Sequence, residues 1–94
     1  MGTIRQQIID LLIQETLSAL DISRAVGVAE KDVYGHLAHI EKTVTAQGHK
    51  LARMPISCRA CGFIFRRRRR LTRPGRCPRC HSSRIDYPLF RIEE

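Results

Sequence analysis

The chain has 94 residues, which is enough for one compact domain or two very small modules and too few for a large enzyme fold. Hydrophobic residues make up 43% and charged residues 28%, a globular balance, whereas aromatic residues reach only 5%. We therefore expect a thin, aliphatic core. Seventeen Lys and Arg against nine Asp and Glu give a net charge of +8, which favours a polyanionic partner such as nucleic acid or an acidic protein surface.

The positive charge is concentrated in the second half of the chain. Residues 1–51 carry five basic and six acidic side chains, whereas residues 52–92 carry twelve Arg against the single acid Asp86. All four Cys also lie in this second half. The sequence has neither an apolar run of about 18 residues, as a membrane span needs, nor the pattern of a secretory leader. We therefore expect a cytoplasmic protein that does not interact with membranes.

Capping patterns start the first two of three predicted helices. Thr3 and Gln6 stand three residues apart, the spacing at which a Thr hydroxyl accepts from the third helical amide. Ser18 and Asp21 repeat this pattern ahead of a short second helix. In the first helix, which runs to about Glu15, apolar residues recur at three- and four-residue steps, at Ile4, Ile8, Leu11 and Leu12.

A third helix is predicted directly after the second. Gly27 supplies a left-handed C-cap for the second helix, and the third spans about residues 30–46, with Gly48 as its end. Its apolar stripe consists of Val33, Leu37, Ile40 and Val44. A short helix, a Gly-containing turn and a longer helix are the elements of a helix-turn-helix, whose second helix can enter a DNA major groove.

The run LSALDISRAVGVAEKDVYGHLAHIE, residues 17–41, resembles the winged helix-turn-helix of prokaryotic transcriptional regulators. The resemblance implies that HKLARMPIS, residues 49–57, supplies a wing-like strand. It also implies that the third helix reads DNA, with four outward side chains nearest the bases: Lys31, Tyr34, His36 and His39. A plain three-helix bundle that binds protein or nothing stays open, because the same apolar residues serve either role. Glu30 and Asp32 would repel phosphates, so DNA affinity needs charge from elsewhere.

Four cysteines have the spacing of a metal site. The pairs Cys58-x-x-Cys61 and Cys77-x-x-Cys80 are separated by fifteen residues, within the range of a tetrahedral zinc site built from two knuckles. Four thiolates close the coordination sphere, so we expect one structural zinc ion rather than a catalytic one. His81 stands where a Gly often follows the second knuckle.

The sequence gives less support to other roles for these cysteines. Disulfides need an oxidising compartment, which nothing in the sequence indicates. The run from Cys77 to His81 matches a c-type haem attachment motif, but haem would leave the first cysteine pair unused. Iron in a rubredoxin-like four-thiolate site stays open, because such sites do not discriminate strongly between zinc and iron.

The sequence around the cysteines predicts a small antiparallel zinc ribbon. Phe63–Phe65 is a β-prone run, Pro74–Gly75 marks a hairpin turn, and later strands are expected around Ile85 and over residues 89–92. Seven arginines should lie near this turn and clamp phosphates, because a guanidinium forks onto phosphate oxygens. They are Arg66, Arg67, Arg68, Arg69, Arg70, Arg73 and Arg76. The alternative is a solvated face that keeps the protein soluble.

The sequence thus predicts an α+β protein, with a three-helix winged helix-turn-helix over residues 1–51 and a four-cysteine ribbon over 52–94. This order of modules resembles small prokaryotic predicted transcriptional regulators that carry a helix-turn-helix before a rubredoxin-like zinc ribbon. The resemblance implies a regulator that binds double-stranded DNA. An adaptor of transcription or translation machinery, bound to RNA or an acidic protein, is the alternative. No catalytic motif frames the Ser, Asp and His residues, so we expect no enzyme. A homodimer stays open, without a dedicated interface segment.

Overall fold

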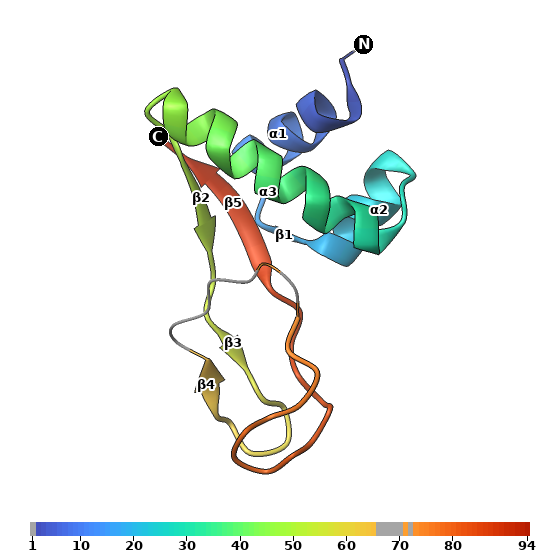
Figure 1. Cartoon of the computed structure of the whole chain (residues 1–94), viewed down its shortest axis with the longest axis vertical. Helices are drawn as coiled ribbons and strands as arrows, with labels where there is room; N and C mark the ends of the chain where they lie inside the picture. The colour runs from blue at the N-terminus through green and yellow to red at the C-terminus, as the bar shows by residue number, and fades with distance from the viewer. Residues whose placement is uncertain (1, 66–70, 72) are drawn as a thin grey trace.

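The computed structural model describes residues 2–65, 71 and 73–94. Figure 1 shows the helices at one end of the molecule and a narrower ribbon at the other, joined by the strands between them. Three helices, two small antiparallel sheets and a C-terminal ribbon confirm the predicted α+β architecture. The elements are α1 (Ile4–Gln14), β1 (Leu17–Ser18), α2 (Ala19–Val26), α3 (Glu30–Ala46), β2 (Lys50–Arg53), β3 (Ile56–Ser57), β4 (Ile64–Phe65) and β5 (Leu89–Glu93).

Local sequence chemistry caps the N-termini of α1 and α2 and the C-terminus of α2. The Thr3 hydroxyl accepts from the amide of Gln6 at 3.2 Å and starts α1. Ser18 and Asp21 form a complete capping box at α2, with both hydrogen bonds at 3.1 Å. Gly27 ends α2 in the left-handed conformation, with φ of 73°. α3 begins after Ala29 without a side-chain cap, since Ala has no acceptor.

The strand that completes the larger sheet, β5, follows the ribbon in the sequence. The strand order is β1-β5-β2, with Leu17 opposite Phe90 and Leu51 opposite Ile92. We expected residues 89–92 to belong to the ribbon alone, whereas the structure places them between two strands of the helical part. The reason is burial, because alternate side chains of β5 point into the core between the helices and the sheet.

One aliphatic core unites the three helices and this sheet. Phe90 is the largest of its fully buried side chains. Ile92 lies two residues further along β5, and Leu51 lies opposite Ile92 on the neighbouring strand β2. The remaining buried members come from the three helices: Ile8, Leu12, Ala19, Ile22, Val33, Leu37, Ile40 and Val44. The expected boundary between residues 51 and 52 falls inside β2, and the core of the helical part includes residues from both sides of it.

The ribbon is built on one short hairpin. β3 and β4 pair antiparallel, with Ile56 opposite Phe65, and the first cysteine knuckle lies in the loop that joins them. We also expected a hairpin at Pro74–Gly75, but the described residues between 71 and 84 contain no strand. The second knuckle begins directly after this turn, at Cys77. Its backbone hydrogen bonds, from the Cys77 amide to Ser82 and from the His81 amide to Cys77, lie within the knuckle rather than between strands. Among the described residues, no helix combines the length and the apolarity needed to cross a bilayer.

Candidate metal centre and nucleic-acid interface

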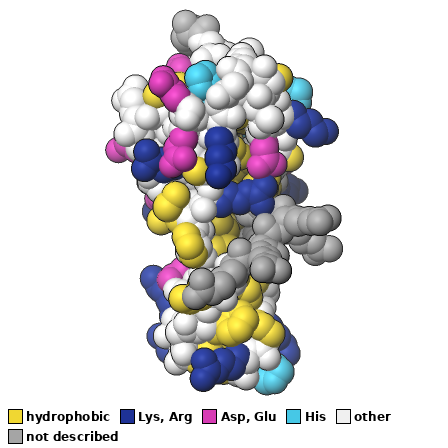
Figure 2. All heavy atoms as spheres, turned by 90° about the vertical axis from the view of Figure 1, so that its left-hand side faces the viewer, with side chains coloured by type: hydrophobic (Ala, Val, Ile, Leu, Met, Phe, Trp, Pro, Cys, Tyr) yellow, Lys and Arg dark blue, Asp and Glu magenta, His cyan; other side chains and the backbone are white. Residues whose placement is uncertain are grey.

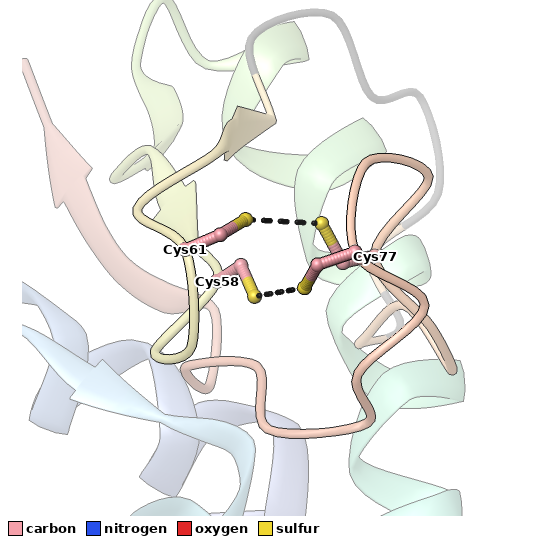
Figure 3. Close-up of side chains that lie close together, drawn as sticks. Cys58, Cys61 and Cys77 are labelled. Atoms are coloured by element: carbon pink, nitrogen blue, oxygen red, sulfur yellow. Dashed lines mark hydrogen bonds between the residues drawn. The ribbon is translucent and has the colours of Figure 1, made fainter.

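The four cysteine sulfurs converge at the end of the ribbon away from the helices. They lie within 4.8 Å of one another, and all four cysteines are free. The Sγ atoms of Cys58 and Cys80 are 3.5 Å apart, and those of Cys61 and Cys77 are 3.6 Å apart (Figure 3). A tetrahedral zinc ion with Zn–S bonds of about 2.3 Å separates its sulfur ligands by about 3.8 Å. The cluster therefore has the size and the donor set of a structural zinc site.

The two knuckles that carry these sulfurs have the same backbone design. The amide of Gly62 donates to the Cys58 carbonyl at 2.9 Å, and the amide of His81 donates to the Cys77 carbonyl at the same distance. Both residues follow their knuckle in the left-handed region, with φ of 78° for Gly62 and 63° for His81. His81 thus occupies a position that favours glycine, as the sequence indicated.

The electrostatics of the cluster also favour a bound cation. Burial raises the pKa of the Cys77 thiol, but hydrogen bonds from the Cys80 and Arg79 amides and from neighbouring thiols outweigh it and lower this pKa to about 7. The Ser82 amide lowers the pKa of Cys80, but burial and the three other sulfurs together raise it to about 12. Ionising all four thiols costs free energy, because the thiolates repel one another. A divalent cation offsets this repulsion. Four thiolates leave no open coordination position, so the role of the metal is structural.

A polar clamp around Asp86 holds the two knuckles together. One carboxylate oxygen of Asp86 accepts from the Ser57 hydroxyl at 2.8 Å, and the other accepts from Nε of Arg59 at 2.7 Å. These two hydrogen bonds, and then the charge of Arg59, hold the pKa of Asp86 below its usual range. The Asp86 amide also donates to the Ser57 carbonyl at 3.0 Å. The strand before the first knuckle is therefore tied to the segment that follows the second.

The predicted DNA-reading residues of α3 do not share one face. Lys31 and His39 are exposed, as expected. His36 is half-buried and accepts at Nδ1 from Nε of Arg5, at 3.3 Å. Tyr34 differs most from the expectation, because it packs against the core and its hydroxyl is buried. Burial, and then the charge of Glu30, raise the pKa of Tyr34.

Helix geometry explains the position of Tyr34. Residues 34 and 41 lie on the same flank of α3, since seven residues make nearly two turns. Glu41 pairs there with Arg53 of β2 at 2.8 Å, so this flank faces the strands that lead to the ribbon. The backbone amide of Arg73, from the ribbon, and then the charge of Arg73 act in the opposite direction and lower the pKa of the Tyr34 hydroxyl. Tyr34 is therefore a contact between α3 and the ribbon.

The predicted arginine clamp is described only in part. Arg66 to Arg70 lie outside the residues that the structure describes. The Arg73 guanidinium lies 4.5 Å from the centre of the Tyr87 ring in a cation–π contact, and Arg76 is exposed. Figure 2 shows Lys and Arg intermixed with Asp and Glu on the helical part, and exposed hydrophobic side chains between that part and the ribbon.

The sequence did not predict two residues that contact the candidate nucleic-acid-binding side chains. Arg5 was not assigned to the interface, although it contacts His36. Tyr87 was not assigned either, although it stacks against Arg73. Neither partner could be found from spacing, because each contact joins segments that meet only in the folded chain.

The chain is similar to known proteins over its whole length. The family described as PF0610-like, N-terminal, matches residues 3–52, and the PF0610 rubredoxin-like zinc beta-ribbon domain matches residues 55–94. The solution NMR structure of protein PF0610 from Pyrococcus furiosus is 32% identical and superposes with a TM-score of 0.82. The similarity covers 100% of this chain and 93% of that one. No curated protein matches the chain. With both domain families matched in order, and with the cysteine geometry that the second requires, the chain belongs to the PF0610-like family of proteins with a rubredoxin-like zinc ribbon.

Proposed function

We propose that this protein is a DNA-binding transcriptional regulator in which α3 enters the major groove and the zinc ribbon contacts the DNA backbone beside it. The observation that carries this proposal is the pairing of β2 with β5. These strands stand where the two strands of a wing pair, and the chain that connects them is the whole zinc ribbon. The ribbon thus replaces the tip of the wing, next to the flank of α3 that bears Tyr34.

The charge of the ribbon supports a backbone contact. Residues 52–92 contain twelve Arg and a single acid, Asp86, which is already engaged by Ser57 and Arg59. Four thiolates and one Zn²⁺ together add only two negative charges, so the zinc-loaded chain keeps about six of its eight positive charges. Arginine suits phosphate, because its planar fork can donate two parallel hydrogen bonds.

A salt titration tests the backbone contacts. The zinc-loaded full chain is bound to duplex DNA over a range of salt concentrations, and Arg66, Arg68 and Arg70 are changed to Gln one at a time. Each lost phosphate contact should flatten the slope of log K against log salt by about 0.9. Arg91→Gln is the matched control, since Arg91 is an exposed arginine of β5 that pairs with Glu93 at 3.4 Å. Equal slopes for all four variants would contradict a contact between the ribbon and the DNA backbone.

Selection from a random duplex pool tests sequence-specific regulation. The zinc-loaded full chain is used at physiological salt, and the retained duplexes are sequenced. An enriched motif supports a regulator, and a palindromic motif also indicates a dimer. Retention without a motif, at an affinity set by charge alone, would contradict base reading by α3.

A second candidate function is an adaptor of transcription or translation machinery that binds RNA or an acidic protein. The acidic first turn of α3 favours it, because Glu30 and Asp32 would face the phosphates that a recognition helix approaches. Polymerase or ribosomal components that stay bound to the protein after nuclease treatment would support this function. Their complete loss with nuclease would rule out a protein-mediated adaptor.

A further inference from the structure

A depression lies between α1 and α3, on the flank of α3 away from Tyr34. Its volume is about 380 Å³, and it is open to solvent. Two helices and the turn before α3 contribute to it, so it exists only in the folded helical part. The residues that line it are Arg5, Val28, Lys31, Asp32, Gly35 and His36.

Basic groups dominate the lining of this depression. Arg5 donates from Nε to Nδ1 of His36 at 3.3 Å, which requires the neutral imidazole with its proton on Nε2. Both side chains therefore still offer N–H groups to a ligand, the remaining guanidinium N–H groups of Arg5 and Nε2–H of His36. Lys31 adds an ammonium group from one turn before Gly35. Asp32 is the single acid of the lining, so the site keeps one net positive charge with His36 neutral.

Gly35 is the unusual residue of this site. It lies in the second turn of α3, inside the helix, where glycine is a poor helix former. It needs no special backbone conformation there, and a Cβ at this position would meet nothing within 4 Å. Gly35 is exposed, opposite the buried stripe of the helix. The fold itself therefore gives no reason for a glycine, whereas the missing side chain opens the depression to a close-fitting ligand.

We infer that Arg5, Lys31 and His36 bind one phosphate group of a nucleic-acid strand, and that Gly35 leaves the room in which this phosphate sits. The inference rests on the proposed function for the identity of the strand, and on the described side chains for the phosphate chemistry. α3 would then be flanked by phosphate contacts on both sides, from the ribbon on one and from this pocket on the other. Such an arrangement fits a helix that lies between the two strands bordering a major groove.

Substitutions at Gly35 separate binding from folding. Gly35→Leu fills the depression, and it should raise the thermal midpoint of unfolding because Leu is a far better helix former than Gly. The same variant should weaken duplex binding by about tenfold, the size of effect expected for losing one charge-assisted hydrogen bond. A variant that is more stable yet binds more weakly cannot be explained by misfolding. Gly35→Leu with undiminished duplex affinity would overturn the inference.

Charge substitutions test the phosphate contact itself. Arg5→Gln should flatten the salt slope by about 0.9, whereas Asp32→Asn should strengthen binding by removing the opposing charge. The matched control is Lys42→Gln, since Lys42 is an exposed cation of α3 that does not line the depression. Equal slopes for Arg5→Gln and Lys42→Gln, with the wild-type protein bound to DNA, would overturn the inference and leave the proposed function intact.

Inorganic phosphate separates failure of the site from failure of the proposed function. If the wild-type protein does not bind duplex DNA, the regulator proposal fails, and millimolar phosphate is titrated while the amide signal of Gly35 and the ring signals of His36 are followed by NMR. Saturable shifts that disappear in Arg5→Gln would support a site for a phosphate group from another source. If phosphate causes no NMR shifts, or causes the same shifts in Arg5→Gln, the inferred phosphate site would be overturned.

Discussion

Leu51 of β2 and Ile92 of β5 are paired neighbours in the larger sheet, although almost the whole zinc ribbon lies between them along the chain. Both ends of the ribbon are therefore fixed in one strand pair rather than by a single linker. Leu51 and Ile92 are also buried members of the helical core. The ribbon is consequently held by the core at one end and by the metal centre at the other.

Removal of the metal should unfold the knuckles and spare the helical part. Phe90 and Ile92 are anchored in the core, so we expect protection from amide hydrogen exchange to persist in α1–α3 and in β5 after chelation. Protection should be lost over residues 57–65 and 77–86. Exchange followed by NMR or mass spectrometry measures both regions at once. Simultaneous loss of protection at Val33 and Phe90 would contradict this separation.

His81→Gly should tighten metal binding. His81 holds a left-handed φ of 63° that costs a non-glycine residue about 1 kcal/mol, and glycine adopts it freely. Competition with a chromophoric chelator should therefore show up to about a fivefold gain in zinc affinity, the equivalent of about 1 kcal/mol. The reciprocal variant Gly62→Ala, at the equivalent position of the first knuckle, should lose affinity. A loss in His81→Gly would instead assign the imidazole a direct role at the metal centre.

Phe90→Ala should destabilise the helical part, although Phe90 lies in the ribbon half of the sequence. Phe90 is fully buried, and replacing such a side chain with Ala costs about 3–5 kcal/mol. Leu89→Ala is the matched control, because its neighbour Leu89 is 38% exposed and should lose little. Thermal unfolding followed by the helical signal in far-UV circular dichroism measures both variants. Similar midpoints for the two variants would mean that β5 does not complete the core.

Asp86→Asn should lower the free energy of unfolding of the ribbon by the same amount at every pH near neutrality. The pKa of Asp86 is lowered in the folded protein, so its carboxylate contributes stability above its ordinary pKa, and this contribution is lost as the pH falls through the folded value. The loss should be below about 1 kcal/mol, because the Arg59 and Asp86 side chains are 69% and 41% exposed. Unfolding of the zinc-loaded protein at pH 6, 7 and 8 measures it. A difference between variant and wild type that grows with pH over this range would show that Asp86 titrates there.

Local chemistry in the sequence was sufficient for the helices and the metal ligands. The hydroxyls of Thr3 and Ser18 and the left-handed Gly27 act on residues three or four positions away, so their effects can be read from spacing alone. The cysteine pairs are equally local, because a knuckle is a single turn. Their convergence on one metal follows from the chemistry of four thiolates.

The partner of β5 and the flank occupied by Tyr34 could not be predicted in this way. The alternation of Leu89–Glu93 predicts a strand with one buried face, but it does not say which strands lie beside it. Tyr34 follows the pattern of an exposed helical residue until the ribbon is placed against its flank. The contact between Arg5 and His36 likewise depends on how α1 crosses α3, which no spacing within either helix determines.

The return of β5 to the helical part also sets the order in which the protein can be completed during synthesis. The ribosome makes all three helices and the entire ribbon before it makes Phe90, the largest side chain of the fully buried core. A nascent chain that ends before residue 89 therefore has its helices but lacks the strand between β1 and β2. The domain that starts first cannot finish first, so the knuckles can capture their metal while the helical core is still open.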